Sequence, residues 1–439
     1  IVEHGQGHIL KFWDELTVSQ QTEFILQLES IDFELFAELQ KVSDVASLGE
    51  LIPAPVLHLE DSYKDVGETH IRNGELGVLT VAGGQGTRLG WSGPKGTFPA
   101  TPITGKSLFQ ILAEQIVFAS KKYDVTIPWY IMTSKENDAI TQSFLLDNNC
   151  FGLDRTDIMV FTQEEVPVID SGGKMLLASK WKVAMNPDGH GGVVTALKNS
   201  GGLAEMEARG VKYISYVQID NPLANVINPA FLGAHLSDES SREVTSKCVQ
   251  KTNSNERVGV FCIENKRTTI VEYSDLPFEK ANEQTEEGVL RFAAGSIALH
   301  LMSADFLQRI AEEMPWHIAH KKVPYINLES GELVQPEEPN AYKYERFVFD
   351  VLPLASNSLV VECDRKEEFA PIKNADGDDS PTTSHQLQLD RAMRWLRANS
   401  VKVSASAKVE LSPLTAASAD DLDKCDLPES IGDDEIVVL

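Results

Sequence analysis

A glycine-rich stretch carries the clearest chemical signal in the sequence. It reads Leu79-Thr-Val-Ala-Gly-Gly-Gln-Gly-Thr-Arg-Leu-Gly90, and Pro94 and Lys95 follow closely. Because glycine has no Cβ, this backbone can turn sharply and approach a ligand, and its N–H groups can converge on phosphate oxygens. Arg88 and Lys95 add cationic donors that backbone amides alone do not supply. The stretch therefore predicts a phosphate-binding loop.

A flexible glycine loop with incidental charges is the alternative interpretation of the same residues. From Gly84 the pattern is G-x-G-x-x-L, which differs from the dinucleotide fingerprint G-x-G-x-x-G, and no GK[ST] closes it as in a Walker loop. The stretch therefore matches neither of these two common phosphate loops.

A carboxylate follows another apolar run, Val217-Gln-Ile-Asp-Asn-Pro222. This run predicts a strand with Asp220 at its carboxyl end, where ligands bind in open α/β sheets. Mg²⁺ commonly takes one or two protein carboxylates and its other ligands from phosphates and water. We expect Asp220 to bind Mg²⁺, although an Asx cap at a strand end would also explain it.

The segment Asn186-Pro-Asp-Gly-His-Gly-Gly192 is a second glycine-rich turn, and Gln163 follows the strand expected before it. Backbone groups of such a turn could contact a flat base, and the Gln163 amide can both donate and accept hydrogen bonds. The plainer alternatives are a tight turn that begins a helix and a surface glutamine.

The elements around these residues alternate between strand and helix. The glycine-rich stretch follows a strand expected at 76–82 and precedes a helix expected at 107–120, where Ser107 and Gln110 have the spacing of a capping box. Alternation predicts an α/β fold with a doubly wound, mostly parallel sheet. The further strands are expected at 127–133, 157–162 and 211–219, and the further helices at 136–147, 193–199 and 203–209.

Three consecutive segments are expected along the chain. Amphipathic spacing predicts two or three helices in an N-terminal helical region, residues 1–70, before the first sheet strand. A catalytic domain would span 71–388, and 389–439 would form a small unit with a helix and short strands. The acidic tail from Ala419 is expected to be solvated and loosely ordered.

The composition limits the possible partners and compartment. A formal net charge of −27 argues against nucleic acid and anionic membranes as partners. A phosphate ligand remains compatible with this charge, because a bound Mg²⁺ masks its charge and a few cations in a cleft can outweigh a distant acidic surface. No apolar run has membrane-spanning length, no signal-peptide pattern follows Ile1, and the five cysteines lack metal spacing. We expect a cytoplasmic protein with free thiols.

Taken together, these stretches resemble the eukaryotic-type UDP-sugar pyrophosphorylases, and among them the UDP-N-acetylhexosamine pyrophosphorylases. GGxGTRLG with Pro94-Lys95 behind it resembles the signature of sugar-1-phosphate nucleotidylyltransferases. The matches occur in family order from about residue 75 to residue 385. They are Phe161-Thr-Gln163, Pro187-Asp-Gly-His-Gly-Gly192, Arg209-Gly-Val-Lys-Tyr213, Gln218-Ile-Asp-Asn221, Val258-Gly-Val260, Val271-Glu-Tyr-Ser-Asp275, Pro336-x-x-Pro-Asn340, Lys343-Tyr-Glu-Arg-Phe-Val-Phe-Asp350, Pro371-Ile-Lys-Asn-Ala-Asp376 and Pro381-Thr-Thr383.

This resemblance implies a Rossmann-like, GT-A-like nucleotidyltransferase fold and a role for each matching residue. It implies that UTP is held by Gly83, Gly84, Gln85, Gly86, Thr87, Gln163 and Gly189, the last two on uracil. Its implied catalytic cations are Arg88 and Lys95 on the UTP phosphates and Lys373 on the sugar phosphate, with Asp220 near Mg²⁺. The sugar would contact His190, Gly259, Glu272, Ser296, Phe347 and Phe349.

Two motifs depart from the family pattern, both on the sugar side, at His190 and at Ser296 with Leu299. The family turn PDGNGG has His190 in place of its asparagine, and the family's GN-I-x-N-H reads Gly295-Ser-Ile-Ala-Leu-His300. Ser296 is shorter than the asparagine it replaces, whereas His190 can keep a hydrogen bond through a ring nitrogen. Uridylyl transfer is therefore better supported than the identity of the sugar.

The resemblance implies UTP and a sugar-1-phosphate as substrates and Mg²⁺ as cofactor, with N-acetylglucosamine-1-phosphate as the expected sugar. Glucose-1-phosphate or a broad range of sugar phosphates is the alternative, and a nucleotide-sugar-binding protein without catalysis is a third interpretation. Lys95, Asp220 and Lys373 argue against the third, because a binding protein would not need all three. We expect a monomer, with a dimer left open.

Overall fold

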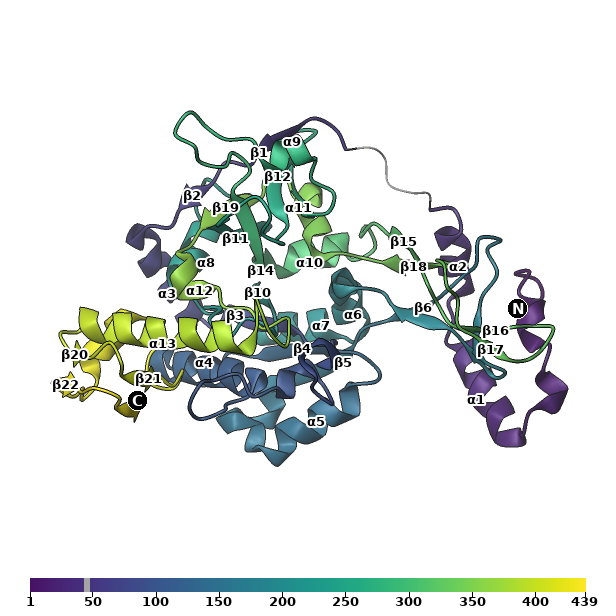
Figure 1. Cartoon of the computed structure of the whole chain (residues 1–439), viewed down its shortest axis with the longest axis horizontal. Helices are drawn as coiled ribbons and strands as arrows, with labels where there is room; N and C mark the ends of the chain where they lie inside the picture. The colour runs from purple at the N-terminus through teal and green to yellow at the C-terminus, as the bar shows by residue number, and fades with distance from the viewer. Residues whose placement is uncertain (43–47) are drawn as a thin grey trace. The chain divides into compact units, whose positions relative to one another are not determined.

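The computed structural model describes residues 1–42 and 48–439, which form two compact units (Figure 1). The smaller unit contains Ile1–Leu48, Gln163–Val194 and Glu313–Asp350. The larger unit contains Gly49–Thr162, Thr195–Glu312 and Val351–Leu439. Both units are thus assembled from separate stretches of the chain. The three consecutive segments expected from the sequence are a different division, and their boundaries stay a prediction.

The larger unit is built on an 11-stranded sheet of the described residues. Strands β10, β3, β4 and β5 are parallel neighbours, and β14 is antiparallel to both β10 and β11. The mostly parallel α/β fold predicted from the sequence is confirmed. In spatial order the main strands are β2 (Leu57–His58), β19 (Leu359–Glu362), β11 (Val244–Gln250), β14 (Ala294–Ser303), β10 (Tyr213–Gln218), β3 (Leu76–Val81), β4 (Trp129–Thr133) and β5 (Ile158–Thr162), and β1 (Leu51–Pro53), β12 (Val260–Glu264) and β13 (Arg267–Val271) join them at β14.

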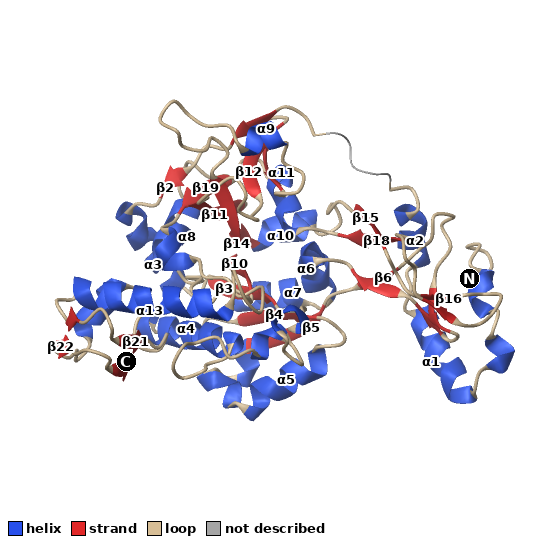
Figure 2. Ribbon diagram, viewed as in Figure 1, coloured by secondary structure: helices blue, strands red, loops and turns tan. Residues whose placement is uncertain are grey.

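Helices cover both faces of this sheet (Figure 2). Successive strand residues point to opposite faces. On β4, the Trp129 ring contacts the Phe109 ring of α4 at 6.1 Å between centroids, whereas the next residue, Tyr130, donates a hydrogen bond to Glu205 of α7. The helices are α3 (Lys64–Arg72), α4 (Leu108–Tyr123), α5 (Asp138–Asp147), α6 (Val193–Asn199), α7 (Gly202–Arg209), α8 (Pro229–His235), α9 (Phe278–Ala281), α10 (Ala304–Ile310), α11 (Val351–Leu354) and α12 (Arg365–Glu368).

The helix that follows the glycine-rich stretch begins as predicted, but its cap is simpler. The Ser107 hydroxyl accepts a hydrogen bond from Gln110 N at the start of α4. The Gln110 side chain donates instead to Glu114 Oε1 at 2.8 Å. The expected reciprocal capping box is therefore only half formed, because Glu114 on the next turn offers the glutamine amide a charged acceptor.

The smaller unit combines N-terminal helices with short hairpins. A capping box between Thr17 and Gln20 begins α1 (Val18–Glu29), and Asp32 caps α2 (Phe33–Leu39). Ile9, Phe24, Phe36 and other apolar side chains of these helices form one core with the hairpins. The hairpins pair β6 (Glu165–Pro167) with β9 (Met185–Pro187), β7 (Leu177–Ser179) with β8 (Lys182–Val183), β15 (His317–Lys321) with β18 (Ala341–Glu345), and β16 (Tyr325–Ile326) with β17 (Leu333–Val334).

The C-terminal segment is ordered, so the prediction of a loosely ordered tail was wrong. Helix α13 (Pro381–Ala398) leads into β20 (Lys402–Val403) and β21 (Lys408–Glu410), and β22 (Ser430–Ile431) and β23 (Ile436–Val438) pair with them in parallel. Leu422 and Ile431 are buried in a small core with the Trp395 side of α13. Strand pairing and the burial of a few apolar side chains therefore order this segment in spite of its acidic composition.

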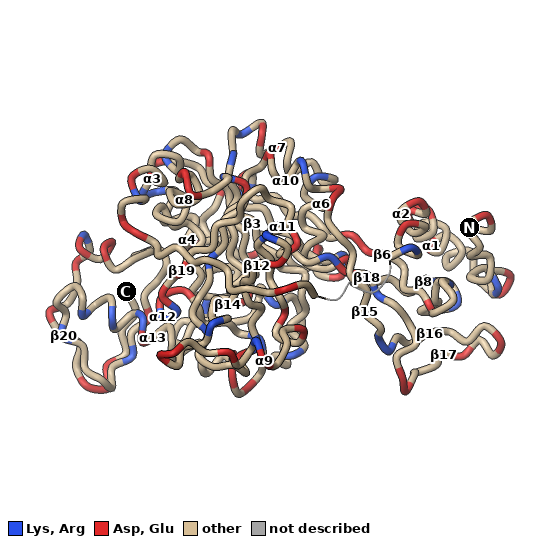
Figure 3. Tube along the Cα trace, turned by 90° about the horizontal axis from the view of Figure 1, so that it is seen from above, with Lys and Arg blue, Asp and Glu red and all other residues tan. Residues whose placement is uncertain are grey.

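Charge is spread along the whole trace rather than confined to this tail (Figure 3). In the part of the chain that the structure describes, no helix combines the length and apolar character that crossing a membrane requires.

Candidate active site

The glycine-rich stretch folds back on itself in the larger unit. Lys95 N donates to Gly84 O at 3.0 Å, and Gly86 N donates to Gly93 O at 3.0 Å. Asn137, a residue that sequence reasoning missed, donates from its side chain to Gly83 O at 2.8 Å. The stretch is thus a closed loop directly after β3, at the carboxyl end of a parallel strand.

Two kinds of glycine occupy this loop. A Cβ on Gly86 would lie 2.6 Å from Trp91 Cβ, so that glycine is needed for packing. Gly84 is exposed and a Cβ there would meet no atom within 4 Å, so the protein itself does not require a glycine at that position. Arg88, in the turn Thr87–Leu89, is exposed and has no ion-pair partner among the described residues. An open glycine and an unpaired cation leave room and charge for an anion.

Lys95, Asp220 and Lys373 come together although they are far apart in the sequence. Lys95 Nζ lies 3.2 Å from Asp220 Oδ2, and the two side chains are 13% and 15% exposed. Burial by itself would raise the pKa of the Asp220 carboxyl, but Lys95 and then Lys373 hold it below its ordinary value. The charges of Lys95 and Lys373 therefore keep Asp220 ionised.

The segment that carries Lys373 is fixed to the end of β10. Ile372 N donates to Asp220 O at 2.8 Å. Asn221, which is 5% exposed, donates to Glu368 O at 2.7 Å and accepts from Ala370 N at 3.0 Å. The motif around Asn221 was noted in the sequence, but no role followed from it, because its partners lie about 150 residues further on.

Asp379 is a second site residue that sequence reasoning missed. Its Oδ2 lies 3.9 Å from Lys373 Nζ, and its carbonyl oxygen accepts from Lys373 N. Burial raises the pKa of the Asp379 carboxyl, and Asp220 adds to this while Lys373 opposes it. Lys373 thus interacts with two carboxylates, Asp220 and Asp379.

Three of the predicted sugar-side residues also meet in the larger unit. Ser296 N donates to Gly259 O at 2.8 Å, and a Cβ on Gly259 would lie 3.3 Å from Glu272 Oε1. The Ser296 hydroxyl accepts from Ala298 N at 3.2 Å, where β14 bulges opposite β11. Burial raises the pKa of Glu272, with a further contribution from Asp275, whereas Lys373 lowers it. The Ser296 hydroxyl thus already has one backbone partner, two residues further along β14.

The other predicted contacts, Gln163, Gly189, His190, Phe347 and Phe349, belong to the smaller unit. Gly189 has φ +84°, and a Cβ there would lie 2.4 Å from Arg346 O, so only glycine fits. The His190 ring lies 5.5 Å from the Phe347 ring and 5.9 Å from the Phe349 ring. These rings form an aromatic cluster beside the second glycine-rich turn.

The hydrogen bonds of His190 determine its tautomer. Its Nδ1 accepts from Val348 N at 3.1 Å, and burial lowers the pKa of the ring to about 4. A neutral imidazole with an accepting Nδ1 carries its proton on Nε2. His190 therefore offers Nε2–H as a donor, whereas an asparagine offers both a donor and an acceptor.

The donor set fits a magnesium ion that takes most of its ligands from substrates. Within residues 1–42 and 48–439, no group of three or more His, Cys, Asp or Glu side chains could hold a metal. A single carboxylate such as Asp220, beside phosphate oxygens and water, is a common arrangement for Mg²⁺.

The fold and the cluster of charges at the carboxyl ends of its strands define a nucleotidyltransferase of the UDP-sugar pyrophosphorylase type. The chain belongs to the family described as UTP–glucose-1-phosphate uridylyltransferase, which matches residues 41–418. The family resemblance identified in the sequence is thereby confirmed.

Similar proteins extend over nearly the whole chain. UDP-N-acetylglucosamine pyrophosphorylase of Saccharomyces cerevisiae is 33% identical, covering 94% of this chain and 93% of the yeast protein. UDP-N-acetylhexosamine pyrophosphorylase-like protein 1 of Xenopus tropicalis is 36% identical, covering 90% of this chain and 83% of that protein. The crystal structure of the putative UDP-N-acetylglucosamine pyrophosphorylase from Entamoeba histolytica has a TM-score of 0.78 at 31% identity, covering 89% of this chain and 99% of that one.

Proposed function

We propose that this uridylyltransferase forms UDP-N-acetylglucosamine and pyrophosphate from UTP and N-acetylglucosamine-1-phosphate, with Mg²⁺ as cofactor. The observation that carries the proposal is the largely buried ion pair Lys95–Asp220, with Lys373 near it, beside the open glycine loop. Two cations that both act on one carboxylate suit a reaction that brings two phosphate groups and a metal ion together. We place the protein in the cytoplasm, as a monomer.

The chemistry needs no nucleophilic side chain. An oxygen of the sugar phosphate attacks the α-phosphorus of UTP in line, one phosphoanhydride bond forms, and the bond to pyrophosphate breaks. The attacking oxygen is already ionised at neutral pH, so no general base is required. The residues contribute by positioning and by neutralising charge in the transition state.

Each charged residue has a separate part in this proposal. Arg88 and Lys95 bind the triphosphate, the loop N–H groups orient it, and Lys373 holds the sugar phosphate near the α-phosphorus. Asp220 would hold Mg²⁺, which supplies charge neutralisation on the phosphate oxygens when bound. Because Lys95 Nζ lies 3.2 Å from Asp220 Oδ2, the lysine and the metal-ligand candidate can act on the same triphosphate.

The choice of the acetamido sugar rests on the relatives and on the aromatic cluster at His190. Relatives from yeast and Arabidopsis thaliana are named for UDP-N-acetylglucosamine. Ser296, whose hydroxyl accepts from Ala298 N, favours a second candidate substrate. With a serine in place of the longer family asparagine, glucose-1-phosphate or several sugar phosphates become possible substrates.

Pyrophosphate release from UTP with a panel of sugar-1-phosphates tests these alternatives. We expect the highest kcat/KM with N-acetylglucosamine-1-phosphate. A higher value with glucose-1-phosphate would establish the second candidate, and UDP-sugar binding without turnover would establish a binding protein. CTP and ATP in place of UTP serve as controls for uridine selectivity.

A further inference from the structure

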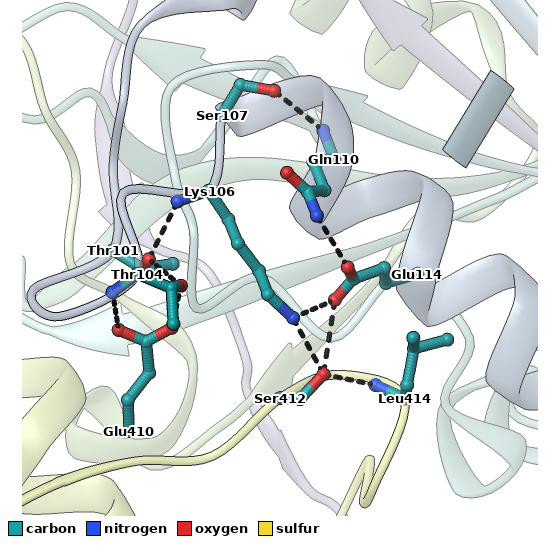
Figure 4. A network of polar contacts seen from close by, with 9 residues as sticks. All are labelled: Thr101, Thr104, Lys106, Ser107, Gln110, Glu114, Glu410, Ser412 and Leu414. Atoms are coloured by element: carbon teal, nitrogen blue, oxygen red, sulfur yellow. Dashed lines mark hydrogen bonds and ion pairs between the residues drawn. The ribbon is translucent and has the colours of Figure 1, made fainter. Parts of the chain in front are cut away.

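The C-terminal segment reaches the loop that follows Lys95. Glu410, the last residue of β21, is 5% exposed. Its carboxylate accepts from Ile103 N at 2.7 Å, from Thr104 N at 2.9 Å and from the Thr104 hydroxyl (Figure 4). These donors lie at the tip of the loop 99–107, so a single carboxylate accepts hydrogen bonds from both tip residues, Ile103 and Thr104.

A second contact joins the same two segments. Lys106 Nζ donates to Glu114 Oε2 at 2.6 Å and to the Ser412 hydroxyl at 2.8 Å, and Ser412 donates to Glu114 Oε2 at 3.2 Å (Figure 4). The Lys106 and Glu114 side chains are 14% and 5% exposed. In Figure 4 the segment of Glu410 and Ser412 lies along the loop and the first turns of α4.

Hydrogen bonds lead from this tip back to Lys95. Ala100 N donates to Lys106 O at 2.8 Å and Leu108 N to Phe98 O at 3.1 Å, so the two sides of the loop are paired. Phe98 N in turn donates to Lys95 O at 3.0 Å. A continuous series of hydrogen bonds therefore connects Glu410, through the loop 99–107 and Phe98, to the backbone of Lys95.

We propose that Glu410 is a positioning residue that acts through Lys95. Removing its carboxylate leaves two backbone N–H groups without an acceptor, and an unsatisfied buried donor is costly enough for the loop to rearrange. A small displacement of a reacting geometry can lower turnover strongly. The inference rests on the proposed role of Lys95 at the UTP phosphates and extends it to the C-terminal segment.

A double-mutant cycle tests this coupling. We expect Glu410→Ala to lower kcat by about 10-fold in the parent enzyme but by less than about 2-fold in the Lys95→Ala background, because residues that act through one another are not additive. Glu410→Gln keeps the length and one accepting oxygen, so it should retain most of the parent kcat. Equal losses in both backgrounds, or parent-like turnover of Glu410→Ala, would overturn the inference.

Lys122→Gln is the matched control. It removes the 2.6 Å ion pair between Lys122 and Asp421, which ties the same C-terminal segment to α4 away from the loop. We expect parent-like kcat in this variant. A loss equal to that of Glu410→Ala would mean that only general docking of the segment matters.

Hydrogen exchange supplies a readout that does not depend on activity. Glu410→Ala should speed exchange at Ile103 and Thr104 and also at Phe98, whereas Lys122→Gln should not. Unchanged exchange at Phe98 would overturn the inference. If the parent enzyme turns over no sugar phosphate, the proposed function fails, while the exchange result still reports on the loop. If Glu410→Ala does not fold, Glu410→Asp is taken through the same cycle, because the shorter side chain no longer reaches both Ile103 N and Thr104 N; a loss of the same size in the parent and Lys95→Ala backgrounds would again overturn the inference.

Discussion

At the scale of single residues, the candidate site holds three cations and two carboxylates. Lys95 and Lys373 each lie near a carboxylate, Asp220 and Asp379 respectively, whereas Arg88 has no ion-pair partner in the described chain. Ion pairs with limited exposure are screened less by water than surface pairs. The cations at this site therefore keep a strong attraction for phosphate groups.

Lys95→Ala should lower kcat by at least about 100-fold, because one charge-assisted donor in a water-excluded site contributes about 3 kcal/mol to transition-state stabilisation. Steady-state pyrophosphate release and circular dichroism of the folded variant are the measurements. Lys121→Ala, an exposed lysine of α4, is the control. Turnover close to that of the parent in a well-folded variant would remove Lys95 from the site.

Asp220→Asn should lower both the rate and the affinity for Mg²⁺, because a neutral amide is a weaker ligand for a hard cation than a carboxylate. The rate is measured against Mg²⁺ concentration after treatment with a chelator. Full activity of chelator-treated parent enzyme would exclude the metal assignment.

Ser296→Asn combined with His190→Asn should favour N-acetylglucosamine-1-phosphate over glucose-1-phosphate. The ratio of the two kcat/KM values should rise by a factor equivalent to about 1 to 2 kcal/mol, the value of one hydrogen bond. The physical reason is that Ser296 is shorter than asparagine and its hydroxyl already accepts from Ala298 N, while His190 offers only a donor. Each single variant is measured beside the double variant. An unchanged ratio in the double variant would contradict this view of sugar discrimination.

At the scale of elements, the segment between α12 and α13 carries Lys373 and depends on one side chain of another segment. Asn221, just after β10, donates to Glu368 O and accepts from Ala370 N. Ser384 of α13 donates to Ala370 O at 2.7 Å. The metal-ligand candidate Asp220 and the cation Lys373 are thus coupled through the backbone.

Asn221→Ala should raise the KM for the sugar phosphate by about 10-fold and leave the KM for UTP nearly unchanged, because losing two buried hydrogen bonds of about 1 kcal/mol each frees only the Lys373 segment. Initial rates with each substrate varied in turn give both constants. Equal rises in the two constants would show a general loss of structure instead.

At the scale of the whole molecule, buried ionisable groups connect stability to pH. His235 of α8 is fully buried, its Nδ1 lies 2.9 Å from the Thr245 hydroxyl, and burial lowers its pKa to about 3. The ring is therefore neutral in the folded protein at any pH at which the chain is expected to work.

The free energy of unfolding should fall as pH drops from about 6.5 toward 4, because the unfolded chain then binds a proton at His235 that the folded chain excludes. Above pH 7 neither state binds this proton and the contribution is constant. Urea unfolding at several pH values gives the slope, and His235→Gln should flatten it. The same slope in parent and variant would exclude His235 as its source.

Local patterns in the sequence were sufficient for the elements around β3. The apolar run predicted at 76–82 is β3, Leu76–Val81, and Ser107 begins α4 as predicted. The reason is that apolar periodicity, glycines and caps act over a few residues. The glycine loop and its two cations could therefore be named as candidates before any contact was known.

Contacts between distant residues were decided only by the tertiary structure. Lys95 and Asp220 are 125 residues apart, and Glu410 is 306 residues from Thr104. The chain from Ala419 has a composition typical of a solvated tail, yet β22 and β23 pair with β20 and β21. No local pattern encodes such pairs, because their stability comes from burial and from hydrogen bonds that exist only once the chain has folded.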